Sequence, residues 1–90
     1  MAKRGRLEIM ENTLNIIREN RNFIRPTVLL RKSKMSSMKF KDYYNDLIKN
    51  GFIKEIFDDD DRKHVSLTEK GMKFLERYKV IIDFIDEFEL

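Results

Sequence analysis

The feature that most constrains the fold of this chain is one β-hairpin set between helical segments. Residues 52–57 predict a strand, and residues 63–67 alternate between apolar and polar side chains as a second strand does. Asp58–Asp61 supply the polar turn between the two strands. We therefore expect a mainly α-helical fold with a small β-hairpin.

Helical periodicity precedes the hairpin in three places. A first helix is predicted over residues 6–20, a second over residues 27–33 and a third over residues 37–50. Pro26 suits the first turn of a helix, where its missing N–H costs no hydrogen bond, and residues 23–25 before it are expected to form a short strand. The apolar stripe of the first helix consists of Leu7, Ile9, Met10, Leu14, Ile16 and Ile17.

Residues that cap helices mark the third helix and the last. Ser36 has a hydroxyl that can accept a hydrogen bond from the unpaired N–H groups at the start of the third helix. Gly51 fits the left-handed conformation that ends a helix. Thr68 is the predicted cap of a last helix over residues 69–88, which would be about 30 Å long. The predicted inward face of the third helix consists of Phe40, Tyr43, Tyr44, Leu47 and Ile48.

Three stretches of the chain resemble archaeal winged-helix regulators. Arg25–Leu30 resembles the start of their second helix, and Val65–Gly71 resembles the passage from their wing to their last helix. The match to their recognition helix and its exit into the wing is carried by Ser36, Phe40, Tyr43, Leu47, Ile48, Gly51, Phe52 and Ile53. Over about residues 7–85 the chain is similar to the small dimeric winged helix-turn-helix DNA-binding proteins of archaea.

The resemblance implies a winged helix-turn-helix DNA-binding domain over residues 1–68 and a C-terminal dimerisation helix over residues 69–90. In that group the last helix pairs as an antiparallel coiled coil, so double-stranded DNA and a second copy are the implied partners. Two positions depart from the pattern. Ser37 stands where that group often has an aromatic residue, and Asp58–Asp61 stand where a wing that touches DNA is usually basic or neutral.

Charge is divided unevenly along the chain. The whole sequence has a formal net charge of +3, but residues 1–54 carry +8 and residues 55–90 carry −5. A basic first half suits a polyanionic partner.

In a winged-helix protein the third helix lies in the major groove of DNA. Met38, Lys39, Asp42, Asn45 and Lys49 are expected to point outward, with Ser37 and Lys41 near the boundary. Asn45 could pair with adenine and Lys39 with guanine, whereas Asp42 could accept from cytosine and Met38 could contact a thymine methyl group. The alternative is that these are ordinary solvated helix residues.

Basic side chains lie before this helix in the sequence and again after it, in the predicted wing. Arg25 and Thr27 lie at the start of the second helix, where N–H groups bind phosphate readily, and Lys3, Arg4 and Arg6 form a basic N-terminal arm. A solvated run of charges is the alternative for both groups. The candidate DNA-binding residues are Arg25, Thr27, Arg31, Lys34, Ser36, Ser37, Met38, Lys39, Lys41, Asp42, Asn45, Arg62 and Lys63.

The four aspartates are expected to form a solvated turn in which their side chains cap the backbone. Arg62 and Lys63 follow them and could reach phosphate while the aspartates point away. A calcium site is a remote alternative, because the usual glycine and distal glutamate are missing. His64 is expected to be a solvated strand residue.

The last helix carries an apolar heptad seam, with basic residues in its first half and acidic residues in its second. Antiparallel pairing with a second copy would set each acidic end beside a basic start. Packing of the stripe on the chain's own domain is the alternative. The predicted dimerisation residues are Phe74, Leu75, Tyr78, Ile81, Ile82, Ile85 and Phe88.

Several function classes have no support in the sequence. The chain has no cysteine, which excludes disulfides and thiolate metal sites, and one histidine without a catalytic constellation around it. We expect no enzyme activity, no cofactor, no membrane span and a cytoplasmic location. The alternative to DNA binding is a winged-helix module that binds proteins through the aspartate turn and the last helix.

Overall fold

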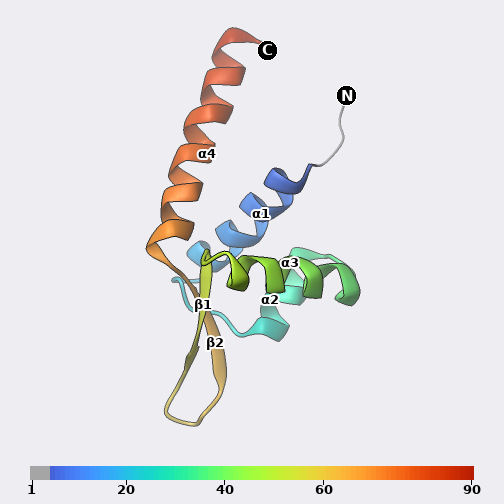
Figure 1. Cartoon of the computed structure of the whole chain (residues 1–90), viewed down its shortest axis with the longest axis vertical. Helices are drawn as coiled ribbons and strands as arrows, with labels where there is room; N and C mark the ends of the chain where they lie inside the picture. Colours follow the sequence, from blue (N-terminus) through green and yellow to red (C-terminus); the bar gives the residue numbers. More distant parts are fainter. Residues whose placement is uncertain (1–4) are drawn as a thin grey trace.

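The protein consists of four helices and one two-stranded antiparallel hairpin (Figure 1). Its structure is a computed structural model that describes residues 5–90. The elements are α1 (Arg6–Glu19), α2 (Pro26–Ser33), α3 (Ser37–Lys49), β1 (Ile53–Phe57), β2 (Lys63–Leu67) and α4 (Glu69–Phe88). The hairpin projects from one end of the helical core and α4 projects from the other, so the molecule measures 49 Å along its longest axis.

This element order is the one predicted from the sequence, and the boundaries differ by a residue or less. The exception is the strand expected over residues 23–25, which is reduced to one bridge. Ile24 donates its N–H to the Val65 carbonyl (3.2 Å) and accepts from the Val65 N–H (2.7 Å). The pairing stops there because Pro26, which has no N–H to donate, already begins α2.

The core lies where α1, α2, α3 and the hairpin meet. Leu14, Ile17, Leu29 and Val65 are completely buried in it. One prediction for α1 is wrong: Leu7 is 57% exposed, because it lies in the first helical turn at the margin of the core. The rest of the predicted stripe packs inward, with Ile9 and Met10 buried and Ile16 half-buried.

A tight junction fixes the start of α4 against the chain that leaves α3. The Thr68 hydroxyl accepts from the Gly71 N–H (3.1 Å) and thereby caps α4, while the Thr68 N–H donates to the Phe52 carbonyl (3.1 Å). Lys70 donates from Nζ to the Asn50 carbonyl at 2.7 Å. A Cβ atom on Gly71 would lie 2.3 Å from the Phe52 carbonyl oxygen, so only glycine permits this approach.

The two halves of α4 have different surroundings. In the first half Leu75 is buried in the core, and the Phe74 ring packs edge-on against Phe52 with centroids 5.6 Å apart. In the second half Val80, Ile81, Phe84 and Phe88 are more than half exposed. Figure 1 shows this second half extending beyond the rest of the protein. The early part of α4 therefore belongs to the core, and the later part presents an apolar face to solvent.

Gly71→Ala should destabilise the protein by about 2 kcal/mol, because the added methyl group must displace the backbone at Phe52. This cost should exceed the gain of about 1 kcal/mol that alanine normally brings to a helix interior. Gly5→Ala is the matched control, since a Cβ at Gly5 meets nothing within 4 Å. Chemical denaturation measures both variants, and an unchanged midpoint for Gly71→Ala would contradict the proposed role of the junction.

Candidate nucleic-acid interface

The predicted division of α3 into an inward and an outward face is confirmed. Phe40 and Leu47 are buried, and Tyr43, Tyr44 and Ile48 are half-buried against the core. As predicted, the Ser36 hydroxyl caps the helix by accepting from the Lys39 N–H (3.2 Å). The exposed outward residues are Ser37, Met38, Lys39, Lys41, Asp42, Asn45 and Lys49.

The other predicted contacts at the start of α2 and in the turn after it are exposed as well. Arg25 is the N-cap residue of α2, and Thr27 and Arg31 lie on its accessible surface. Lys34 ends α2 in the left-handed conformation, with φ of 61° and ψ of 23°. Among residues 5–90, no ion pair engages Arg25, Arg31, Lys34, Lys39 or Lys41.

Two polar contacts join α3 to the neighbouring elements β1 and α1. The Tyr44 hydroxyl donates to a Glu55 carboxylate oxygen on β1 at 2.6 Å, and burial followed by the Glu55 contact raises the pKa of Tyr44. On the other side Arg6 of α1 pairs with Asp46 at 3.1 Å and lies 5.8 Å from the centre of the Tyr43 ring. These contacts could not be predicted from the sequence, because each joins residues from separate elements.

The wing turn is organised by one of its four aspartates. The Asp58 carboxylate accepts from the backbone N–H groups of Asp60 and Arg62, each at 2.9 Å. The Arg62 backbone N–H, followed by the His64 ring, holds the pKa of the Asp58 carboxyl well below its usual range. The expectation that an aspartate side chain caps the turn is confirmed for Asp58.

The basic residues of the wing are engaged within the wing itself. Arg62 pairs with Asp58 at 3.1 Å and with Asp60 at 3.0 Å, and Lys63 pairs with Glu55 at 3.4 Å. Any phosphate contact by Arg62 or Lys63 would have to compete with these ion pairs.

The expectation that His64 is solvated is wrong. Its side chain is only 12% exposed, its Nε2 lies 2.9 Å from Asp58, and its ring stacks on Phe23 with centroids 4.0 Å apart. The reason is that the turn places the Asp58 carboxylate against the His64 ring on β2. Its Nδ1 is buried without a hydrogen-bond partner among residues 5–90.

Some of the remaining expectations concern the termini and absent groups. Lys3 and Arg4 of the basic N-terminal arm lie outside the described residues, and Arg6 is engaged with Asp46. Across residues 5–90, no cluster of three or more His, Asp or Glu side chains is arranged to hold a metal ion. In the same part of the chain, no helix combines the length and apolar character needed to cross a membrane.

The predicted dimerisation residues are not equally accessible. Ile81 and Phe88 are exposed, and Ile82 and Ile85 are half-buried. Phe74 and Tyr78 lie half-buried with stacked rings, and Leu75 is 4% exposed and belongs to the core. The apolar surface that the chain leaves open is therefore displaced toward the C-terminal half of α4, where it also includes Val80 and Phe84.

Comparison with known proteins identifies the architecture. The sequence profile of the family described as winged helix-turn-helix matches residues 3–86. No curated protein sequence matches the chain. The winged helix-turn-helix fold with a long C-terminal helix, predicted from the sequence, is thereby confirmed.

Solved structures with the same fold include bacterial, archaeal and viral proteins. MepR, a transcription regulator of a multidrug efflux pump in Staphylococcus aureus, superimposes with a TM-score of 0.77 at 17% identity. That match covers 89% of this chain but only 60% of MepR, so the chain spans about three fifths of that regulator's length. Sso10a-2, a DNA-binding protein from Sulfolobus solfataricus, gives 0.74 at 23% identity, covering 96% of this chain and 86% of that one. A winged-helix DNA-binding protein of STIV gives 0.74 at 22% identity, covering 89% and 91%.

Asp58→Asn should lower the thermal midpoint at pH 7, because the neutral amide cannot match the hydrogen bonds of the carboxylate. A lowered pKa means that the ionised form stabilises the fold fully above the unfolded pKa of about 3.9 and loses this effect as the pH falls below it. The difference in thermal midpoint between wild type and Asp58→Asn should therefore stay constant from pH 7 to about pH 4.5 and become smaller below about pH 4. Asp59→Asn, at an exposed neighbouring aspartate, is the control and should stay close to wild type throughout. Equal behaviour of the two variants would argue against the role of Asp58.

Proposed function

Since the chain belongs to the winged helix-turn-helix family, we propose that it is a transcriptional regulator or architectural protein that binds double-stranded DNA as a homodimer. The observation that carries the proposal is the outward face of α3. Its polar and charged side chains are exposed, whereas its aromatic and aliphatic side chains are anchored in the core. A helix with this division can enter the major groove without disturbing the fold that supports it.

Base recognition is assigned to the middle of this outward face. Asn45 has the donor and acceptor pair that adenine requires, and Lys39 can donate to guanine. Asp42 is repelled by phosphate, so it suits only a base contact, namely acceptance from the amino group of cytosine. Met38 is 79% exposed and offers an apolar surface for a thymine methyl group.

Phosphate contacts are assigned to the flanks. Arg25 and Thr27 at the start of α2 offer a guanidinium, a hydroxyl and the N–H groups of a helix N-terminus. Arg31 and Lys34 extend the positive charge toward α3, where Lys41 continues it. All of these cations are unpaired within residues 5–90, so phosphate binding breaks no ion pair there.

Replacing Lys39 and Lys41 together by alanine should weaken binding to random duplex DNA by on the order of tenfold at about 0.1 M salt. The slope of log affinity against log salt should also become shallower by about 1, because Lys41 is assigned to a phosphate and Lys39 to a base. Fluorescence anisotropy over a salt series measures both quantities. Arg18→Ala removes an exposed positive charge from α1, away from α3 and from the proposed interface on α4, and should leave the slope unchanged.

The outcomes of this experiment separate the two candidate functions. Steep salt dependence in wild type that becomes shallower only in the α3 variant supports DNA binding. Absence of binding even at low salt would leave the protein-binding winged helix, with the aspartate turn and the end of α4 as its surfaces.

Pairing through the end of α4 is the second part of the proposal. Val80, Ile81, Phe84 and Phe88 recur at helical spacing, and the rings of Phe84 and Phe88 lie 4.8 Å apart. Nothing within residues 5–90 covers this face. A second copy supplies an identical apolar strip, and a two-fold axis is the commonest way for such strips to pair.

The charges on α4 favour antiparallel pairing. Lys70, Lys73 and Arg77 precede the apolar strip, and Asp86 and Glu89 accompany its end. Antiparallel helices place the basic start of one beside the acidic end of the other, which also compensates the unfavourable acidic residues at the helix C-terminus. Two copies of α3 would then face two DNA half-sites or two separate duplexes.

Phe84→Glu should convert the dimer to a monomer, because it places a carboxylate in the centre of the proposed apolar interface. Analytical ultracentrifugation at micromolar protein concentration measures the mass. Phe57→Glu is a matched control on the wing, since Phe57 is 56% exposed and Phe84 is 53% exposed. A dimeric Phe84→Glu variant would show that the interface lies elsewhere.

The relative orientation of the two α4 helices can be tested by disulfide formation between introduced cysteines, because the chain has no cysteine of its own. A mixture of V80C and F88C proteins should form the mixed disulfide if the helices are antiparallel, and V80C or F88C homodimers if they are parallel.

We propose a cytoplasmic location, as the sequence predicts.

A further inference from the structure

The outer edge of β1 is an open strand edge within the described part of the chain. The sheet contains only β1 and β2, and its other edge is occupied at Val65, which exchanges two backbone hydrogen bonds with Ile24. Because both hydrogen-bonding groups of Val65 point toward Ile24, the opposite residue Glu55 points its own N–H and C=O away from β2. The two kinds of pair alternate along an antiparallel ladder, so the same holds for Phe57.

The edge groups of Glu55 and Phe57 are accessible and unused. Both residues are exposed, and the hairpin that carries them projects from the helical core (Figure 1). Within residues 5–90, no hydrogen bond engages the backbone N–H or C=O of either residue. Each of them therefore offers one donor and one acceptor to solvent, which is the pattern that an extended peptide uses when it adds a strand to a sheet.

The end of this edge is acidic. Asp59, Asp60 and Asp61 are exposed, and among residues 5–90 neither Asp59 nor Asp61 forms an ion pair. The basic residues that follow, Arg62 and Lys63, are already paired with carboxylates of the wing. The turn therefore repels phosphate and attracts a positively charged segment.

Phe57 adds an apolar contact beside the open backbone groups. Its side chain is 56% exposed and lies on the same face of β1 as Glu55, because side chains alternate along a strand. Aromatic rings pair favourably with β-branched side chains that lie opposite them on a neighbouring strand. The edge therefore favours a partner strand with a β-branched residue opposite Phe57.

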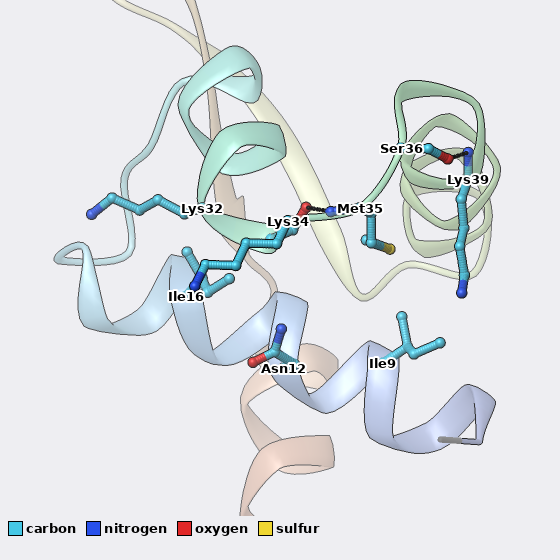
Figure 2. Close-up of a pocket in the computed structure, with 9 residues that line it drawn as sticks. Ile9, Asn12, Ile16, Lys32, Lys34, Met35, Ser36 and Lys39 are labelled. Carbon is cyan, nitrogen blue, oxygen red and sulfur yellow. Dashed lines mark hydrogen bonds between the residues drawn. The ribbon is translucent and has the colours of Figure 1, made fainter. Parts of the chain in front are cut away.

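An open cleft between α1 and the turn that joins α2 to α3 has the opposite charge. Its volume is about 680 Å³, and no Asp or Glu of the described residues lines it. Figure 2 shows Lys34 and Lys39 reaching into it from opposite ends, with Asn12 between Ile9 and Ile16. A basic segment is repelled from this cleft.

A second cleft, between α1 and α4, is acidic as the wing turn is. It has a volume of about 450 Å³, and its carboxylates belong to Glu8, Glu11, Glu76 and Asp83. Both of its walls are helices, whose backbone N–H and C=O groups are bonded along the helix. Positive charge is attracted to this cleft too, but a strand cannot be added there, and an experiment can use this difference to tell the two sites apart.

We propose that the outer edge of β1 binds an extended basic segment of a partner protein, which joins the hairpin as an additional antiparallel strand. The segment exchanges backbone hydrogen bonds with Glu55 and Phe57 and places a β-branched residue opposite Phe57. Because β1 runs toward the turn, the N-terminal end of the segment lies beside the aspartates and carries its basic residues. A second copy fits less well, since pairing centred on Glu55 would set two carboxylates opposite each other. The proposal does not depend on DNA binding.

The binding step is tested without DNA, by titrating the isotope-labelled full chain with the acetylated and amidated peptide KKTVTTT. In the proposed register its valine lies opposite Phe57, its sixth residue lies opposite Glu55, and its lysines lie beside the aspartate turn. The backbone amide signals of Glu55 and Phe57 in the NMR spectrum should move downfield and saturate, because both N–H groups gain an acceptor.

Two matched peptides separate strand addition from charge attraction. N-methylation at the valine and at the sixth residue removes the two N–H groups that donate to Phe57 and Glu55 but keeps both lysines, so binding should weaken about tenfold or more. The peptide EETVTTT keeps these N–H groups but reverses the charge, and it should also bind about tenfold more weakly or worse. Equal binding of the N-methylated peptide, or signal shifts confined to the cleft between α1 and α4, would overturn the proposal.

Variants of the chain test the same edge from the other side. Phe57→Pro removes an outward N–H and no hydrogen bond to β2, a position at which an edge strand tolerates proline, and should bind KKTVTTT about tenfold more weakly. Phe57→Thr keeps the N–H and loses only the ring, so it should bind more tightly than Phe57→Pro. Asp59→Asn/Asp61→Asn leaves the whole edge intact and should weaken binding through charge alone.

The outcomes of these variants decide between the occupants of the edge. Weaker binding by Phe57→Pro than by Phe57→Thr supports strand addition, and equal binding by the two variants would refute it. A lower mass of Phe57→Pro than of wild type in analytical ultracentrifugation would assign the edge to a second copy of the chain, which would also overturn the proposal.

Discussion

The arrangement of this protein depends on the close approach of α4 to the backbone at Phe52. Gly71 has no side chain, so the helix can lie against the Phe52 carbonyl, and the Thr68 N–H donates to the same carbonyl oxygen. Phe52 directly links the end of α3 to β1. One junction thus sets the direction of α4 relative to both α3 and the wing. In a dimer built on α4, this direction would also set the distance between the two copies of α3, and hence the spacing of the DNA sites they could reach.

The wing is stiffened by charges that are satisfied internally. Asp58 accepts from the turn backbone and engages Arg62 and His64, while Glu55 joins Tyr44 of α3 to Lys63 of the wing. These contacts support α3, because the Tyr44 hydroxyl of this helix is hydrogen-bonded to Glu55 on β1. They also account for one of the four consecutive aspartates of the turn. Asp58 is used within the turn, and the basic residues beside it are held in ion pairs.

The division of α4 links the fold to the proposed assembly. Leu75 and Phe74 complete the core, whereas Val80, Ile81, Phe84 and Phe88 are more than half exposed among the described residues. A small domain buries little surface on its own, so a second copy that covered this apolar helix end would add stability and bring in a second α3, as proposed above.

Features of the fold that depend on short-range interactions could be predicted from the sequence, whereas features that depend on distant contacts could not. Helical periodicity, the caps at Ser36 and Thr68 and the turn at Asp58–Asp61 act within a few residues, so the element order, the exposed face of α3 and the fold class could all be predicted. The exposure of Leu7 could not be predicted, because periodicity gives the face of a helix and not where its packing partners end. The burial of His64 could not be predicted either, because its contact with Asp58 depends on the conformation of the whole turn.

By itself, therefore, the sequence determined which segments are helices and strands and which side of α3 faces outward. Only the tertiary structure decided which residues of α4 are buried in the core and which cations remain unpaired. It also decided that Asn12, Lys34 and Lys39 line the same cleft. The physical reason is that these properties depend on distances between segments far apart in the chain. Such distances are set by how the elements pack together and not by any local preference of the residues involved.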